Sequence, residues 1–241
     1  MTIVKNDLYD YYGLSIYQDE DNFKFSLDSI LLAEFVDIDR KIDKIVDFCT
    51  GNAPVPLILS TKTDNTIYGI ELQESIANLA ELSVKENNVE KQIKIIKDNI
   101  KNVDKHFSAE SIDVITCNPP YFKVNNDNSL TNENRVKAIA RHELEMDMED
   151  IMKSSRYLLK NKGSLYIVHR CDRLEELFVL LNRYKFGVKK VQFVYSDINK
   201  EAIMVLIKAI KNANIGSLKV CAPLDISNLE SYKGILNEVK E

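Results

Sequence analysis

The chain of 241 residues has little glycine: only seven occur, which is roughly half of the average usage of about 7%. No two glycines are closer than 18 positions. The phosphate-binding loops of dinucleotide-binding folds, P-loop NTPases and kinases each need several glycines within one turn, because the backbone must approach the phosphates closely. The spacing therefore excludes these three loops in their strict form. A nucleotide must be held in another way.

The sequence also lacks an excess of positive charge and any closely spaced cysteines. Lysine and arginine total 32 against 37 aspartates and glutamates, a net charge of −5, so overall charge does not predict nucleic-acid binding and only a local basic surface remains open.

The four cysteines lie at least 50 positions apart and only three histidines accompany them. This pattern argues against a zinc site or a disulfide framework and fits a reducing cytosol. We expect no metal.

The sequence also shows no targeting segment and no membrane-spanning segment. Residues 1–7 do not combine a charged segment with an apolar one, and no apolar run approaches the roughly 20 residues of a membrane span. We expect a cytoplasmic protein without a membrane partner, either a monomer or a weak dimer. A hydrophobic content of 45% is enough to bury a substantial core.

Short apolar runs alternate with segments of helical periodicity along most of the chain. After a leading helix at 26–36, with Ser26 as its N-cap, the predicted strands are 44–48, 66–70, 92–96, 112–117 and 164–169. The predicted helices between and after them are 54–60, 73–88, 99–106, 147–159 and 174–183. Strands separated by helices imply right-handed crossovers, so the fold class is α/β with a doubly wound, mostly parallel sheet.

The end of the chain departs from this alternation. Two β-rich runs, 191–195 and 202–207, are joined by only six residues, too few for a crossover, which predicts a C-terminal antiparallel hairpin. An additional edge strand at 218–221 is left open. We expect a single domain over 1–241, in which 1–40 is a helical lead-in, 41–210 the core and 211–241 a C-terminal extension. The long unpatterned segment 122–141 is typical of functional or mobile loops.

Polar residues follow four successive predicted strands. Asp47 and a turn at Gly51 end the first, Glu71 the second, Asp98 the third and Asn118 the fourth. Taken singly, Glu71 and Asp98 are most simply helix N-terminal residues, and Asp47 with Gly51 is most simply a tight turn. Together they mark one edge of the sheet, because ligands of doubly wound folds bind outside the carboxyl ends of the strands, and Glu71 lies near the spacing of an acid that binds ribose hydroxyls.

The motif Asn118-Pro119-Pro120-Tyr121 is the most specific signal in the sequence. Two prolines fix the backbone and remove two donors, so carbonyl oxygens and the Asn118 side-chain oxygen remain as acceptors. A planar amine could be captured by these acceptors while Tyr121 stacks on its ring. The simpler alternative is a rigid turn that ends a strand, with Tyr121 in the core.

These residues make the chain resemble the class I S-adenosylmethionine-dependent methyltransferases of Rossmann-like fold with a seven-stranded sheet, and in particular the branch with an Asn-Pro-Pro-Tyr motif. Segments 23–33, 47–52, 68–71 and 140–143 further resemble the bacterial tRNA N6-adenine methyltransferases, which modify the adenosine 3′ of the anticodon in a valine tRNA. One departure lies at the first turn, where Cys49 and Ala53 flank a single Gly51 and relatives usually carry further glycines or small residues.

The resemblance implies roles for particular residues. Those implied to bind S-adenosyl-L-methionine are Phe25, Ser26, Asp28, Asp47, Thr50, Gly51, Glu71, Leu72, Asp98, Asn99 and Asn118. Those implied to form the adenine pocket and carry the transfer are Asn118, Pro119, Pro120 and Tyr121. If the oxygens of Asn118 and Pro119 accept both amine hydrogens, the nitrogen lone pair can turn toward the methyl group, and no base is needed before the transfer.

A tRNA partner requires positive surface near this pocket. The segment after the motif supplies Lys123, Arg135, Lys137, Arg141 and His142, of which Lys123, Arg141 and His142 together with Tyr121 are the expected substrate-binding residues. A second candidate cluster is Arg183, Lys185, Lys189 and Lys190.

Alternative functions remain open at this point. They are an N5-glutamine protein methyltransferase, an rRNA or DNA amino-methyltransferase with the same motif, and a nonenzymatic RNA-binding protein on this fold. Only some 40 residues precede the first core strand, which leaves little room for the separate substrate-recognition domains that the protein and DNA enzymes usually carry.

Overall fold

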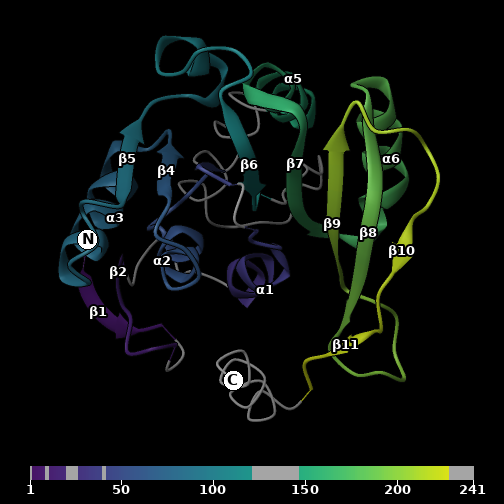
Figure 1. Ribbon diagram of the computed structural model, residues 1–241. Helices are drawn as coiled ribbons and strands as arrows, with labels where there is room; N and C mark the ends of the chain where they lie inside the picture. The colour runs from purple at the N-terminus through teal and green to yellow at the C-terminus, as the bar shows by residue number, and fades with distance from the viewer. Residues whose placement is uncertain (1, 9–10, 20–26, 40–41, 121–146, 228–241) are drawn as a thin grey trace, which may run out of the picture.

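The computed structural model describes residues 2–8, 11–19, 27–39, 42–120 and 147–227. Its centre is a twisted sheet whose main strands lie in the order β8-β9-β7-β6-β3-β4-β5 (Figure 1). These strands are β3 (Lys44–Phe48), β4 (Thr66–Glu71), β5 (Ile93–Lys97), β6 (Ile112–Cys117), β7 (Leu159–Arg170), β8 (Phe186–Tyr195) and β9 (Met204–Lys211). All neighbours are parallel except the pairs β7–β9 and β8–β9, as the sequence predicts for the C-terminal hairpin.

Helices cover both faces of this sheet. One apolar core lies between the sheet and α1 (Leu27–Phe35), α2 (Pro54–Ser60) and α3 (Glu74–Glu86). The other lies between the sheet and η1 (Ile100–Lys105), α5 (Met148–Leu158) and α6 (Leu174–Arg183), with η2 (Cys171–Arg173) leading into α6. Because side chains alternate along a strand, Ile45 of β3 enters the first core and Val46 the second.

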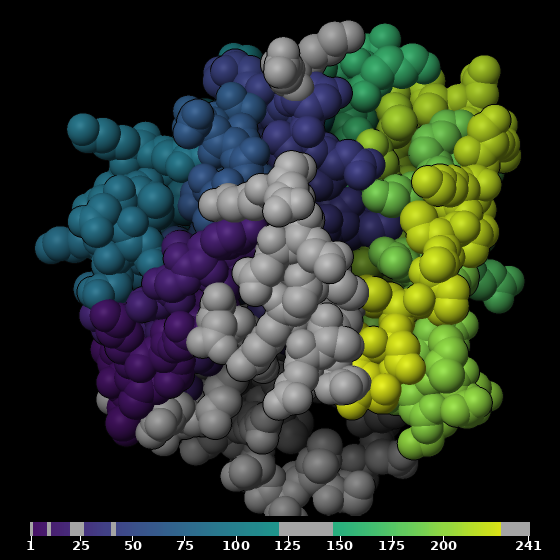
Figure 2. Space-filling model, turned by 60° about the horizontal axis from the view of Figure 1, so that its bottom comes forward, coloured from purple at the N-terminus to yellow at the C-terminus, as the bar shows by residue number. Residues whose placement is uncertain are grey.

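The N-terminal part differs from the helical lead-in that the sequence predicts. An antiparallel pair, β1 (Ile3–Asp7) and β2 (Ser15–Asp19), precedes α1. The hairpin packs on α3, where the Ser83 hydroxyl accepts the backbone N–H of Tyr17 at 2.9 Å. Figure 2 shows the purple hairpin on the same flank as the blue-teal residues of this region. Alternation in the run 15–19 was too short to separate a strand from the polar segment around it.

Other differences concern boundaries and edges. Lys44–Phe48, Pro54–Ser60, Ile112–Cys117 and Leu174–Arg183 begin and end as predicted, and the helix predicted near 99–106 is the 3₁₀ helix η1 over Ile100–Lys105. Two short strands, β10 (Lys219–Val220) and β11 (Leu224–Asp225), both pair with β8, so the sheet exceeds the seven strands of the prediction. No helix in the described ranges combines the length and apolarity that crossing a membrane requires.

Candidate functional site

Strand order reverses at β3, which has β4 on one side and β6 on the other. Gly69 of β4, Asp47 of β3 and Thr116 of β6 lie opposite one another in a row across these strands. With side-chain alternation, the same face carries Glu71 two residues beyond Gly69 and Asn118 two residues beyond Thr116. The structure therefore brings the predicted residues 47, 71 and 118 together at the switch point, where doubly wound sheets bind ligands.

Asp47 is the buried centre of this row, with a side chain that is 2% exposed. Its Oδ1 accepts the Thr116 hydroxyl at 2.5 Å and its Oδ2 accepts the Thr50 hydroxyl at 2.7 Å. Burial raises the pKa of Asp47 to about 7, against the lowering effect of these two hydrogen bonds, and the negative charge of Glu71 contributes to the rise. The carboxyl group thus changes charge near neutral pH.

The turn after β3 holds an unusual backbone. Cys49, Gly51 and Ala53 have φ of 56°, 58° and 71°, so every second residue is left-handed, although only one of the three is glycine. The side chain of Thr50 packs over Gly69, where an added Cβ would lie 2.8 Å from both Thr50 Cγ2 and Oγ1. Gly69 is thus the small residue that lets Thr50 reach Asp47.

Glu71 closes this turn from the end of β4. Its Oε2 accepts the backbone N–H of Gly51 at 2.9 Å and its Oε1 accepts that of Gln73 at 3.0 Å. The side chain is 7% exposed. Leu72, the next predicted residue, is 37% exposed beside it.

Asp98 follows β5 and is held by three donors. Its Oδ1 accepts the backbone N–H of Asn99 and the side-chain amide of Asn102, each at 2.7 Å, and its Oδ2 lies 2.7 Å from His106 Nε2. Burial acts to raise the pKa of Asp98, but the hydrogen bonds from Asn102, His106 and Asn99 outweigh it and hold the pKa below its usual value. Asn99 also caps η1. Neither Asn102 nor His106 was predicted, although their positions four and eight residues after Asp98 would place them near it on a following helix.

Asn118 projects toward the first turn of α1. Its Nδ2 donates to the Ser29 hydroxyl at 3.0 Å, a contact between residues 89 positions apart. Pro119 is buried and Pro120 exposed. Asp28, also predicted for the cofactor cleft, lies next to Ser29 in the same turn. Neither Ser29 nor Thr116 was predicted.

The remaining predicted residues divide into two groups. Phe25, Ser26, Tyr121, Lys123, Arg141 and His142 lie outside the described residues, as do Arg135 and Lys137. The second basic cluster is placed at the far edge of the sheet. Phe186, the first residue of β8, lies opposite Lys211, whereas Val194 near its end lies opposite Met204, which in turn pairs with Arg170 at the end of β7.

Arg183 and Lys185, which precede β8, therefore lie at the amino edge, away from Asn118. Lys189 lies within β8 and donates to the carbonyls of Asn214 and Gly216, and Lys190 binds Asp37. Arg183 and Lys185 are thus wrong candidates for the surface around the pocket, because the antiparallel β9 makes β8 run parallel to the core strands.

The acceptor groups at this edge of the sheet fit a cofactor that is cationic and carries a ribose. Three carboxyl groups lie at the carboxyl ends of the adjacent strands β3, β4 and β5, namely Asp47, Glu71 and Asp98. The Asn52 Oδ1 in the same turn is buried without a hydrogen-bond partner in the described part of the chain, although its Nδ2 donates to the Tyr17 carbonyl at 2.8 Å. Acidic and neutral acceptors of this kind suit a sulfonium, an ammonium group and hydroxyls.

Comparison with known proteins agrees with this geometry. The family model described as N-6 DNA Methylase matches residues 29–174, which include the row of Asp47 and Thr116, Asn118 and its partner Ser29. The chain belongs to the N-6 DNA methylase family. As a member of this family it is an S-adenosylmethionine-dependent methyltransferase. Over the described residues, no group of His, Cys, Asp and Glu is arranged to hold a metal ion.

The names of individual relatives specify a substrate. The chain is 23% identical to a tRNA1(Val) (adenine(37)-N6)-methyltransferase of Cytophaga hutchinsonii over 82% of this chain and 81% of the relative. It is 28% identical to a protein of the same name from Tolumonas auensis over 68% and 67%. Among solved structures, one titled as a predicted O-methyltransferase from Agrobacterium tumefaciens has a TM-score of 0.67 at 18% identity, covering 87% of this chain and 95% of the other. This likeness supports the methyltransferase fold.

Proposed function

We propose that this N-6 DNA methylase family member methylates the exocyclic N6 amine of an adenosine in tRNA, namely the anticodon-loop adenosine 3′ of the anticodon in a valine tRNA. The observation that carries the proposal is the position of the Asn118 amide, which lies at the carboxyl end of β6 beside the switch point and on the same face as Asp47 and Glu71. The tRNA-specific names of the relatives support the choice of substrate.

The acceptor groups of the motif account for the chemistry. An aryl amine is a weak nucleophile because its lone pair is delocalised into the ring. Acceptance of its hydrogens by the oxygens of Asn118 and Pro119 lets the nitrogen pyramidalise, and the same dipoles stabilise the positive charge that develops on it. S-adenosylmethionine supplies the methyl group. The proton leaves the nitrogen after transfer, so no general base has to precede it.

The cofactor contacts follow from the acids at the strand ends. We propose that Glu71 accepts the ribose hydroxyls, that Asp98 and Asn99 contact the adenine end, and that Asp47, Thr50 and Gly51 shape the turn against the methionine part. Phe25, Ser26, Asp28 and Leu72 complete this cleft in the proposal. Tyr121 stacks on the target base, and Lys123, Arg141 and His142 contact RNA, since a base in a loop must be splayed out to enter the pocket.

The test uses S-adenosylmethionine labelled in its methyl group. Valine tRNA should accept label as N6-methyladenosine, and the same tRNA with guanosine in place of that adenosine should accept none. Asn118→Ala should reduce transfer by roughly 100-fold, in line with the removal of one preorganised polar group, while cofactor affinity measured by calorimetry stays unchanged. Label in duplex DNA or in a glutamine-containing protein, or tight tRNA binding without any label, would refute the proposal.

A further inference from the structure

Ser29 has a contact that its place in the helix does not explain. It lies in the first turn of α1 and is 6% exposed. Its hydroxyl oxygen accepts a hydrogen from Asn118 Nδ2 at 3.0 Å. The bond joins the helix to the residue that, in the proposed function, touches the reacting amine.

The bond has a directional consequence. A side-chain amide has a donor end and an acceptor end, and rotation of the terminal torsion by half a turn exchanges them with little intrinsic preference. In the structure the NH₂ group faces α1, where the Ser29 hydroxyl accepts from Nδ2 and tethers the amide. In that orientation Oδ1 lies at the opposite end of the amide plane.

We propose that Ser29 is a positioning residue for methyl transfer, which holds the Asn118 amide with Oδ1 directed at the target amine. This inference rests on the proposed function. The reverse orientation would set an NH₂ group against the amine, which needs an acceptor. Such a complex binds cofactor and RNA but does not help the nitrogen to pyramidalise.

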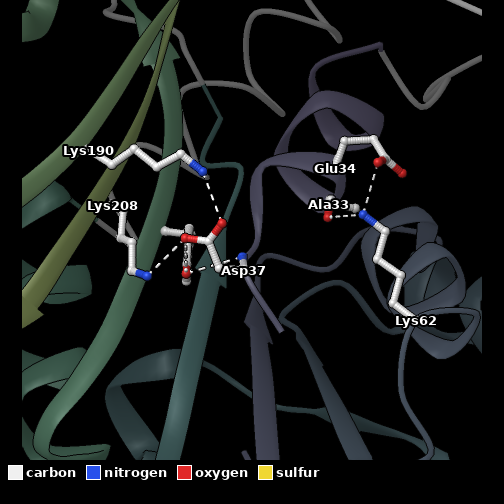
Figure 3. A network of polar contacts seen from close by, with 7 residues as sticks. Ala33, Glu34, Asp37, Lys62, Lys190 and Lys208 are labelled. Carbon is white, nitrogen blue, oxygen red and sulfur yellow. Dashed lines mark hydrogen bonds and ion pairs between the residues drawn. The ribbon is translucent and has the colours of Figure 1, made fainter. Parts of the chain in front are cut away.

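Helix α1, which carries Ser29 in its first turn, is held in place at its other end. Figure 3 shows Lys190 and Lys208 reaching Asp37 just beyond the helix, with Nζ–Oδ distances of 3.0 and 2.9 Å. From the opposite side Lys62 reaches Glu34 and donates to the Ala33 carbonyl, both at 3.0 Å. A hydroxyl carried by a helix fixed in this way can restrain a neighbouring side chain.

Packing around the helix adds to this restraint. Ile30, Leu31 and Leu32 are at most 1% exposed. Lys190 also lies over the Phe35 ring, 4.4 Å from its centroid. Ser29 therefore acts from a rigid support and requires no motion of its own.

The experiment compares Ser29→Ala with Ser29→Thr in the full chain. Single-turnover transfer to valine tRNA should fall about tenfold in Ser29→Ala, which corresponds to the loss of one hydrogen bond of roughly 1.4 kcal/mol. The dissociation constants for cofactor and tRNA should change less than twofold. Ser29→Thr, which keeps the hydroxyl, should recover most of the rate.

Ser154→Ala is the matched control. Ser154 is also 6% exposed, and its hydroxyl donates to the Ile100 carbonyl at 2.9 Å, so this variant loses a comparable buried hydrogen bond that does not involve Asn118. It should lower stability without slowing transfer. The proposal is overturned if Ser29→Ala transfers methyl groups at the wild-type rate. It is also overturned if Ser154→Ala loses transfer rate in the same proportion to its loss of stability as Ser29→Ala does.

A second readout does not depend on transfer. In protein labelled with ¹⁵N-asparagine, the side-chain NH₂ signals of Asn118 are identified by their loss in Asn118→Ala, and Ser29→Ala should shift them while Ser29→Thr leaves them in place. If Ser29→Ala shifts the Asn118 signals but the wild type does not methylate tRNA, the proposed function is wrong while the contact between Ser29 and Asn118 stands. If the wild type methylates tRNA but Ser29→Ala leaves the signals unshifted, the proposed function stands and the role of Ser29 is wrong.

Discussion

The Thr116 hydroxyl donates to Asp47 Oδ1 at 2.5 Å, which ties the end of β6 to the end of β3 at the point where strand order reverses. A second hydroxyl, that of Thr50, reaches the other oxygen of the same carboxyl group. One buried acid thus connects the strand that leads to Asn118 with the turn that is proposed to hold the cofactor.

Ionisation of Asp47 should make stability depend on pH. The pKa is about 7 in the folded state and near 3.8 in the unfolded chain, so between these values the folded state binds more protons. The free energy of unfolding should therefore fall as pH rises from about 4 to 7 and level off above it, with a slope of at most about 1.4 kcal/mol per pH unit from this one group. Urea unfolding of the wild type and Asp47→Asn from pH 5 to 8 measures this contribution.

The variant should lack the Asp47 contribution, so its stability relative to the wild type should improve with rising pH. Glu90→Gln, which changes an exposed carboxylate, is the control and should run parallel to the wild type. Parallel curves for Asp47→Asn would show that Asp47 does not titrate in this range.

Gly69→Ala should disturb the cofactor turn through Thr50. The added Cβ would lie 2.8 Å from two atoms of Thr50 and 3.1 Å from Ile95 Cδ1. Thr50 has to move, and its hydrogen bond to Asp47 is lost. We expect a loss of about 1 to 3 kcal/mol in the free energy of unfolding, as for other overpacked sites, and weaker cofactor binding.

A double-mutant cycle isolates this cause. Thr50→Ala removes both clashing atoms, so Gly69→Ala should cost much less in that background than in the wild type. If the two costs simply add, the clash lies elsewhere and the role assigned to Gly69 is wrong.

His106 should support the cofactor through Asp98. Its Nε2 lies 2.7 Å from Asp98 Oδ2, and the two side chains are 31% and 24% exposed. Pairs that water reaches contribute modestly, so His106→Ala should weaken cofactor binding about two- to fivefold. Calorimetric titration with S-adenosylmethionine measures the change. His106→Gln retains a donor and should bind more tightly than His106→Ala; equal affinities of all three proteins would exclude a role for the contact.

Much of this site was accessible from the sequence, and the reason lies in strand alternation. Asp47, Glu71 and Asn118 each follow a short apolar run, and parallel strands bring their carboxyl ends to one edge. The contact of Asn118 with Ser29 could not be predicted, because it spans 89 positions and depends on how α1 docks on the sheet.

The wrong placement of Arg183 and Lys185 has a similar origin. The hairpin was expected, but the directions of its strands relative to the core decide which edge of the sheet these two residues occupy, and no local pattern encodes those directions. The N-terminal strands β1 and β2 escaped prediction because polar and charged residues occupy much of each strand and β1 is mostly exposed, so neither has the apolar run that marks the core strands.

Cys49 occupies a left-handed backbone position in the turn, where glycine would be the usual residue. Cys49 has φ of 56°, a conformation that costs a residue with a Cβ about 1 to 2 kcal/mol. A hydrogen bond between the thiols of Cys49 and Cys117, together with burial, raises the pKa of Cys49, so the group stays a neutral thiol. Cys49→Gly relieves the backbone but loses this contact, and we expect the free energy of unfolding to stay within about 1 kcal/mol of the wild type.

Cys49→Val should behave differently, because a β-branched side chain at positive φ is strongly disfavoured. We expect a loss of about 2 kcal/mol or more with weaker cofactor binding, measured by urea unfolding and calorimetry. The control is Cys117→Val: this residue is buried in β6, where the extended backbone favours valine. If the two valine variants lose the same stability, the strain at Cys49 is not the cause, because both substitutions place the same side chain next to the other thiol and only Cys49 has a left-handed backbone.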